Sequence, residues 1–242
     1  MAGWATPFPL APKQLLLLSF IAILSHPILD TLNTYGVRWL MPFSGKWFYG
    51  DTLFIVDPWL WLVLTLGIYS SRRRERFARS DPSRPAWLAL AVIAVYVGGM
   101  ALSGMAAARI VASEVSLVSG RPVQATMAGP VLLNPLVRQF VTQQEGEYRV
   151  GTLRWLERPR VSRADVLTFP RERPSHPAVL QAAGSPLGRR FLGWARFPTF
   201  EIEQVGPARY LVHIVDLRYA RRPGARFGAI SIPVTLPTAS SP

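Results

Sequence analysis

Apolar residues gather in three segments within the first half of the chain. The first, at residues 14–24, reads QLLLLSFIAIL and continues past a polar stretch to about residue 32. The second covers residues 52–71, and the third covers residues 86–110 with no charge before Arg109. Because about 20 apolar residues cross a bilayer as a helix, this pattern predicts about three membrane-spanning helices.

From about Gly120 the pattern changes to short runs in which apolar and polar residues alternate. Two pairs of such runs flank the turns EGE at residues 145–147 and VGP at residues 205–207, which predicts two antiparallel hairpins. Residues 226–236, RFGAISIPVTL, predict a further strand, and residues 177–195 predict one or two short helices. The second half is therefore expected to be mostly β.

The predicted fold class is an α-helical membrane region of about three spans, followed by a small mostly-β extracytoplasmic domain. We place the membrane region at residues 1–118, the β-rich domain at residues 119–236 and a disordered tail at residues 237–242. The loop at residues 72–84 reads RRRERFARSDPSR, and basic loops between spans face the cytoplasm. The β-rich domain is then expected on the opposite side of the membrane.

Composition supports insertion into a membrane. The chain of 242 residues is 50% hydrophobic and only 17% charged, and it has no cysteine, which excludes a disulfide framework or a thiolate metal site. The net charge of +13 comes mostly from arginine. Beside apolar spans, such charge favours contact with anionic lipid headgroups, so we expect membrane lipids as partners and no nucleic acid. A homo-oligomer and a protein partner are left open.

A polar stretch, SHPILDTLNTYG, interrupts the first apolar segment at residues 25–36. On a helix, His26, Asp30 and Asn33 would share one stripe because they are four and three residues apart. Imidazole nitrogen and carboxylate oxygen are ligands for zinc or manganese. The alternative is that His26 and Asp30 hydrogen-bond to each other or to neighbouring backbone.

Proline and glycine in this stretch predict a broken helix. Pro27 should end the incoming helix, Ser25 could cap a new short helix, and Gly36 should end that helix. No convincing cleavage site follows the apolar run, so we expect this segment to stay in the membrane rather than to be removed as a signal peptide.

Two aspartates follow in GDTLFIVDP, at positions 51 and 57. Carboxylates near a membrane face are candidates for function. The structural alternative is that Asp57 caps a helix whose first residue is Pro58, and that Asp51 likewise caps the second span. The remaining histidines, His176 and His213, have no carboxylate at ligand spacing and are interpreted as structural.

The ordered pattern LSHPILDTLNTYGVRWLMPFSGKWFYGDTLFIVDP at residues 24–58 resembles the inner-membrane-associated metal-dependent hydrolases of the YdjM-like, LexA-binding family. The shared features are a histidine–proline pair, an aspartate four residues on, YG, a tryptophan or leucine before PFS, and an aspartate before FIVDP. The resemblance extends over nearly the whole chain, since family members also have further spans and a β-rich periplasmic tail.

This resemblance implies a multi-pass protein of the cell inner membrane with its C-terminal domain in the periplasm. It also implies a membrane-embedded site for a divalent metal, zinc or manganese, in which His26 and Asp30 are ligands. Asp51 and Asp57 match later acidic positions and would be catalytic, as a general base or as further ligands.

The chain departs from the family pattern at its beginning. Family members carry an aspartate-containing helix and a segment resembling HRGxTHS upstream of the pattern, whereas no histidine precedes His26 here. A start codon assigned too late, or a truncated member, would explain this.

Two functions follow as hypotheses. The first is a metal-dependent hydrolase of a phosphoester or lipid-like substrate, in which the metal lowers the pKa of bound water to about 7. The second is a non-catalytic membrane anchor that presents a periplasmic β domain to a partner or envelope component. A channel or proton carrier is less well supported, because three short spans form a poor pore.

Overall fold

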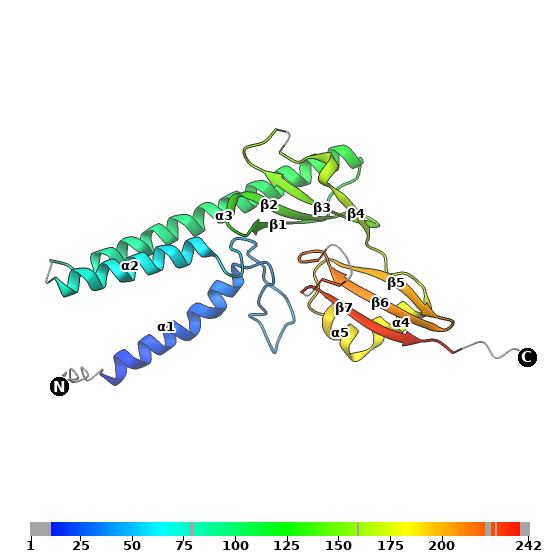
Figure 1. The fold of residues 1–242 in the computed structure, drawn as a ribbon, viewed down its shortest axis with the longest axis horizontal. Coiled ribbons are helices and arrows are strands. Elements are labelled where there is room, and N and C mark those ends of the chain that lie inside the picture. The colour runs from blue at the N-terminus through cyan, green and yellow to red at the C-terminus, as the bar shows by residue number, and fades with distance from the viewer. Residues whose placement is uncertain (1–10, 78–79, 159, 221–223, 226, 238–242) are drawn as a thin grey trace, which may run out of the picture.

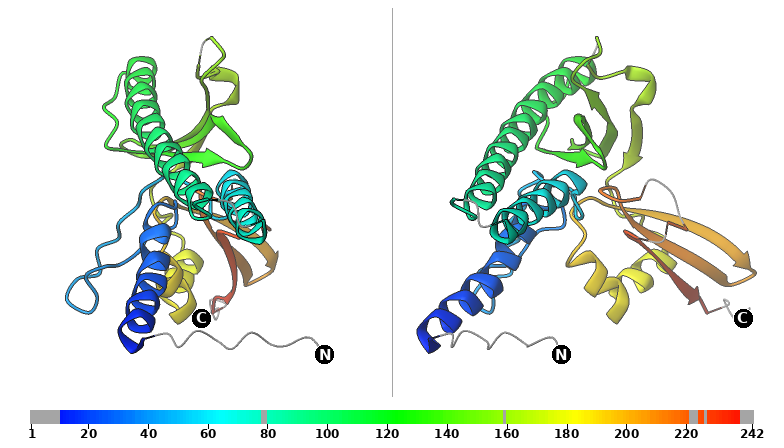
Figure 2. Two further views of the ribbon diagram at one scale, coloured as in Figure 1. Left: turned by 90° about the vertical axis from the view of Figure 1, so that its left-hand side faces the viewer. Right: turned by 60° about the vertical axis from the view of Figure 1, so that its left-hand side comes forward.

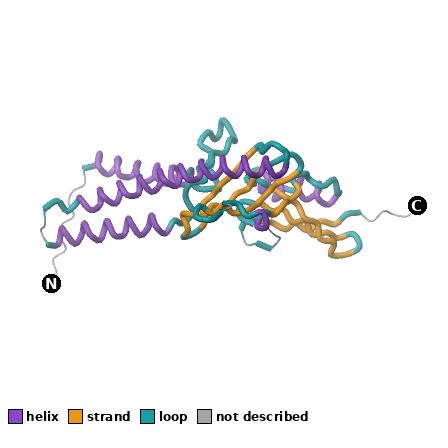
Figure 3. The backbone as a smooth tube through the Cα atoms, turned by 90° about the horizontal axis from the view of Figure 1, so that it is seen from above, coloured by secondary structure: helices purple, strands orange, loops and turns teal. Residues whose placement is uncertain are grey.

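The three long helices and the two sheets lie toward opposite ends of the molecule, although the third long helix continues along one of the sheets (Figures 1 and 3). The computed structural model describes residues 11–77, 80–158, 160–220, 224–225 and 227–237. Three long helices extend from one side of the junction and two β-sheets lie on the other (Figures 1 and 3). The helices are α1 (Pro12–Thr31), α2 (Pro58–Arg76) and α3 (Arg84–Ser119).

Helix α1 is continuous through the position where a break was predicted. Pro27 lies inside it, and it ends at Thr31 rather than at Gly36. The prediction that Ser25 caps a second helix is therefore wrong. Proline lacks an N–H, so only the Ile23 carbonyl, four residues earlier, loses its helical donor. The helix continues past this single lost bond, as prolines are tolerated in long apolar helices.

Two helices among the described residues, α1 and α3, are long and apolar enough to cross a membrane. Helix α2 differs from the predicted second span, because it begins at Pro58 rather than at residue 52 and its last turn contains RRRER. Its apolar part, residues 58–71, is about 21 Å long at 1.5 Å per residue. Helix α3 is longer than predicted, with 36 residues, or about 54 Å.

The first sheet is a four-stranded antiparallel meander in the order β1-β2-β3-β4. Its strands are β1 (Ala125–Val131), β2 (Asn134–Gln143), β3 (Glu147–Arg154) and β4 (Leu167–Pro170), with the short helix η1 (Arg163–Asp165) before β4. The β2–β3 hairpin around EGE confirms the sequence prediction. Strands β1 and β4 were not predicted, because β1 contains Gly129 and Pro130 and β4 has only four residues.

The second sheet is a three-stranded antiparallel meander in the order β5-β6-β7. Its strands are β5 (Pro198–Gly206), β6 (Arg209–Asp216) and β7 (Ala229–Thr235). The hairpin around VGP and the last strand are confirmed. Two short helices, α4 (Pro177–Gly184) and α5 (Pro186–Leu192), confirm the helical prediction, and α4 packs its buried alanines against the second sheet.

The long helix α3 links the apolar region directly to the first sheet (Figure 2). Val111 and Val115 of its last turns share a core with Phe140 and Leu153 of that sheet. Phe197, just before β5, joins another core with residues of β2 and β3, so the two sheets also contact each other. The predicted tail at residues 237–242 lies outside the described residues apart from Pro237.

Candidate functional site

The structure brings His26 and Asp30 together on α1. The His26 Nε2 and Asp30 Oδ2 atoms are 3.2 Å apart, and the His26 side chain is 81% exposed. Asp30 also accepts a hydrogen bond from the Tyr35 hydroxyl. Burial, followed by this bond to Asp30, raises the pKa of Tyr35 to about 12. The geometry therefore corresponds to the alternative in which His26 and Asp30 bond to each other.

Asn33 does not continue the predicted stripe. Helix α1 ends at Thr31, so Asn33 lies in the following turn, where it is buried. Its side-chain nitrogen can donate to the carbonyl groups of Leu53 and Phe54, at 3.1 and 3.2 Å. Asn33 thus holds the polypeptide near the start of α2.

Asp57 has the geometry of a helix N-cap. One of its carboxylate oxygens accepts hydrogen bonds from the backbone N–H groups of Trp59 and Leu60, at 3.1 and 3.2 Å. The other accepts the Tyr96 hydroxyl of α3 at 2.9 Å. The structural alternative for this residue is confirmed, because Pro58 occupies the first helical position.

Asp51 forms an ion pair instead of capping α2, so the cap prediction for this residue is wrong. Its carboxylate lies 2.9 Å from Arg196 Nη1, which donates to both oxygens. The backbone of Asp51 is left-handed, with φ of 48°, and residues 52–57 separate it from the helix. Burial raises the pKa of the Asp51 carboxyl, and the charge of Arg196 opposes that rise.

The four predicted site residues form separate groups. His26 and Asp30 form one pair on α1, Asp57 lies at the start of α2, and Asp51 pairs with Arg196. Among the described residues, which include every histidine and acidic residue of the sequence, no group of three or more His, Cys, Asp or Glu side chains could hold a metal ion. A catalytic zinc site has three protein ligands, so these residues do not fit one.

Three arginines that the sequence did not single out contact the segment between α1 and α2, which we call the connecting segment (residues 32–57). They are Arg138, Arg196 and Arg218. Arg138 of β2 is fully buried and donates to the carbonyl groups of Asp51, Ala128 and Met100. It therefore joins the connecting segment, the first sheet and α3. The sequence VRQF indicated that Arg138 is buried, because Arg138 and the apolar Phe140 are two residues apart and so lie on the same face of the strand.

Arg218 joins the same segment to the second sheet. Its side chain and that of Asp216 are 0% exposed, and the pair is 2.7 Å apart. The guanidinium also donates to the carbonyl groups of Thr34 at 2.9 Å and Trp194 at 2.9 Å. Asp216 further accepts from the Arg196 backbone N–H at 2.9 Å. The buried charge is thus paired and hydrogen-bonded, which limits the cost of removing it from water.

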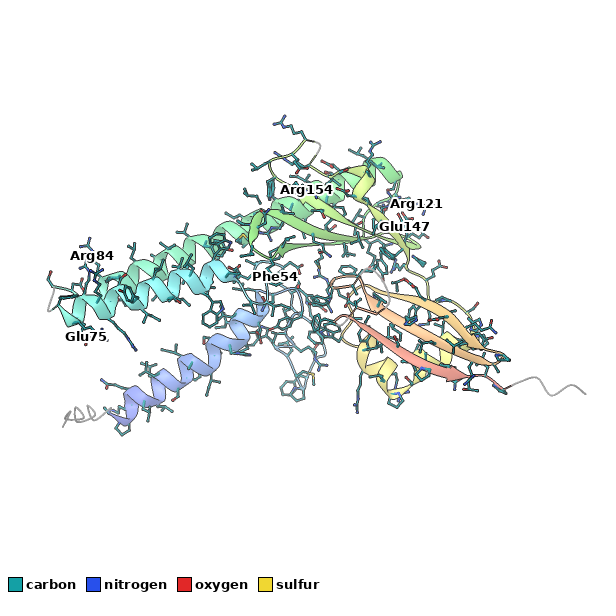
Figure 4. The ribbon with its side chains drawn as sticks, in the orientation of Figure 1. Phe54, Glu75, Arg84, Arg121, Glu147 and Arg154 are labelled. Carbon is teal, nitrogen blue, oxygen red and sulfur yellow. The ribbon has the colours of Figure 1, made fainter. Side chains whose placement is uncertain are left out.

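Figure 4 shows Phe54 of the connecting segment at the junction of the helices with the strands. The aromatic rings of Tyr49 and Trp194 lie against Arg218, with centroids 5.4 and 4.6 Å from its guanidinium carbon. The connecting segment is therefore packed against the β region through arginine–carbonyl bonds and aromatic contacts.

A cleft lies away from the predicted site residues. It has a volume of about 740 Å³ and lies between the last turns of α3 and the segment that leads into β4. Val115, Val118 and Val166 supply apolar walls, while Glu114, Arg149 and Arg163 supply charges of both signs. Arg149 is paired with Glu147 at 2.8 Å. Clefts with apolar walls and a few polar groups are typical ligand or partner sites.

These features define a class of protein in which apolar helices are packed directly against a mostly-β region. The first 116 residues match the model of the family described as YdjM inner membrane protein. This part of the chain is therefore similar to an inner membrane protein family, in agreement with the resemblance predicted from the sequence. The match ends just before the last residues of α3 and covers neither sheet. No curated protein and no solved structure matches the chain.

Proposed function

We propose that the chain is a multi-pass inner membrane protein that anchors its two sheets at the periplasmic face and acts there without catalysis. The observation that carries this proposal is the use of the two predicted catalytic carboxylates in structural contacts. Asp51 pairs with Arg196, and Asp57 caps α2. His26 and Asp30 remain, and they supply two of the three ligands that a catalytic zinc requires.

Three spans are proposed for the anchor. Gly67 of α2 packs closely against Ala89 of α3, so a methyl group added at Gly67 would lie 2.5 Å from the Ala89 side chain. This close packing supports insertion of α2 together with α3. Glu75 and Arg84 lie at the ends of these helices farthest from the strands (Figure 4). The basic loop between them would face the cytoplasm.

The cleft beside α3 is the proposed partner site. Its apolar walls suit an apolar segment of a partner, while the charges in its lining, Glu114 and Arg163 among them, would bond polar groups of that segment. Leu117, which lines the cleft, is 84% exposed. It belongs to the part of α3 that runs along the first sheet and would therefore lie outside the bilayer. Exposed apolar surface outside the bilayer marks interaction sites.

Labelling of single cysteines tests the orientation, because the chain contains no cysteine. Ser80→Cys reports on the basic loop and Gln181→Cys on the β region, and both positions are exposed. In intact cells, a membrane-impermeant maleimide that passes the outer membrane should label Gln181→Cys and not Ser80→Cys. The reverse pattern would place the β region in the cytoplasm and overturn the proposed topology.

The second candidate function is the metal-dependent hydrolase implied by the resemblance. Its specific support is the pairing of His26 and Asp30 within 3.2 Å on an exposed part of α1. Metal content measured by elemental mass spectrometry separates the two candidates, with wild type compared with His26→Ala and with His176→Ala as the matched control. Near-stoichiometric zinc or manganese that is lost only in His26→Ala would support the hydrolase and overturn the non-catalytic anchor. An equal, low metal content in all three proteins is the result expected for the anchor.

A further inference from the structure

The connecting segment contains a projecting loop, residues 37–48, which we call the interfacial loop. Its two ends are joined by backbone hydrogen bonds between Val37 and Phe48, at 3.0 and 2.9 Å. The tip exposes four large apolar side chains, and Phe43 is 96% exposed. These four residues are Trp39, Leu40, Met41 and Phe43.

Two tryptophans of the interfacial loop donate hydrogen bonds to the rest of the molecule. The indole nitrogen of Trp39 donates to Thr31 at the end of α1 at 2.7 Å. That of Trp47 donates to the Gly193 carbonyl next to α5 at 3.0 Å. The interfacial loop is therefore attached to both the helices and the β region.

The loop leaves the ends of α1 and α2 and runs across the direction of these helices (Figure 1). If the helices cross a bilayer, this places the loop along the membrane surface on the side of the strands. The apolar part of α2 is about 21 Å long, shorter than the hydrocarbon core of about 30 Å. Exposed Ile55 and Val56, just before α2, continue the apolar surface toward the loop.

The charge of the loop matches an anionic lipid surface. Residues 37–48 include Arg38 and Lys46 and no acidic residue. Both cations lie over aromatic rings of the loop, with Arg38 4.9 Å from the Trp47 centroid and Lys46 5.4 Å from the Phe48 centroid. Tryptophan, phenylalanine and leucine flanked by basic residues are typical of segments that lie in the membrane interface.

We infer that the interfacial loop inserts its apolar tip into the headgroup region of an anionic phospholipid bilayer, and that Arg38 and Lys46 bind lipid phosphates. This inference rests on the proposed membrane anchoring. It adds a second attachment to the bilayer beside the helices. Because Trp47 is bonded next to α5, this attachment also fixes the position of the second sheet relative to the membrane.

Spin labels on single cysteines test the inference in the full chain. Phe43→Cys is placed at the tip, Val95→Cys on the exposed face of α3 and Val205→Cys near the end of β5. The three native residues are 96%, 77% and 51% exposed. Each protein is reconstituted in vesicles of phosphatidylcholine and phosphatidylglycerol. Collision with oxygen, which concentrates in lipid, is then compared with collision with a water-soluble nickel chelate.

The label at position 43 should show an oxygen-to-nickel ratio severalfold above that at position 205 and below that at position 95. Replacing Arg38 and Lys46 together with glutamine should lower the ratio at position 43 in vesicles with phosphatidylglycerol, and leave it unchanged in vesicles of phosphatidylcholine alone. Together these results would support insertion through anionic lipid.

Each other outcome overturns a defined part of the reasoning. A ratio at position 43 equal to that at position 205 would place the tip in water. Protection from both reagents would mean that a second copy or another protein segment covers the tip. Either result overturns the inference while the membrane anchor stands. A label at position 95 that collides mainly with nickel would instead overturn the proposed membrane anchoring itself, and the inference with it.

Discussion

Replacing Arg218 with alanine should destabilise the junction between the helices and the sheets more than any surface substitution. The change leaves the Asp216 carboxylate buried without its guanidinium partner. It also removes donors from the carbonyl groups of Thr34 and Trp194. Breaking a buried ion pair from one side costs about 3–5 kcal/mol.

The expected effect on thermal unfolding follows from the size of the chain. A chain of 150–250 residues loses roughly 2–4 °C in Tm per kcal/mol. The Arg218→Ala protein should therefore unfold about 6–20 °C below wild type when both are measured in the same detergent by circular dichroism. Arg190→Ala is the matched control, because Arg190 is exposed on α5, and its effect should stay within about 0.5 kcal/mol.

A double variant, Asp216→Asn with Arg218→Met, separates lost charge pairing from lost packing. It removes the unpaired carboxylate charge while it fills most of the space, so its Tm should recover part of the loss. A Tm of Arg218→Ala equal to that of Arg190→Ala would refute the reasoning, because it would mean that the buried pair does not hold the connecting segment.

Three further substitutions have defined outcomes. Asp57→Ala removes the N-cap of α2 and should lower the stability by about 1 kcal/mol, seen as a lower Tm. Asp57→Asn should retain most of the wild-type stability, because asparagine also caps helices; equal losses in the two variants would contradict the capping role. Gly67→Val should separate α2 from α3 because of the close contact with Ala89, so crosslinking between cysteines placed on these two helices should fall. Gly98→Val, where a side chain would meet no atom within 4 Å, should leave this crosslinking unchanged. Burial raises the folded-state pKa of Asp51, so the folded state binds this proton more tightly than the unfolded state does. The contribution of the carboxyl to stability therefore falls as pH rises from its ordinary pKa of about 3.9 through the raised value. The Tm of Asp51→Asn minus the Tm of wild type should therefore increase over that pH interval. A Tm difference that stays constant with pH would contradict a raised pKa for Asp51.

Local signals in the sequence predicted most of the secondary structure. The turns EGE and VGP, between alternating runs, located two hairpins. Asp57 followed by Pro58 indicated the start of α2, since the side chain and the fixed proline φ act within a single turn. These features depend on neighbours in the chain, so they can be recognised without the fold.

The site could be predicted only in part, because its main contacts join distant residues. The four-residue spacing of His26 and Asp30 correctly indicated that they meet. By contrast, Asp51 meets Arg196 across 145 positions, and Arg218 meets Thr34 across 184. Such contacts are set by the packing of the connecting segment on the sheets. Continuation of α1 through Pro27 also escaped prediction, because a proline removes only one helical bond and is tolerated in long apolar helices.

The length of α3 has a mechanical consequence. The same uninterrupted helix that begins at Arg84 carries Val111 and Val115 in the core of the first sheet, so the segment has no hinge at which the sheet could swivel. Helices adapt to bilayers of different thickness by tilting. If α3 crosses the membrane as proposed, a change in its tilt would turn the first sheet and the cleft beside it in the same direction, against the second attachment proposed for the interfacial loop.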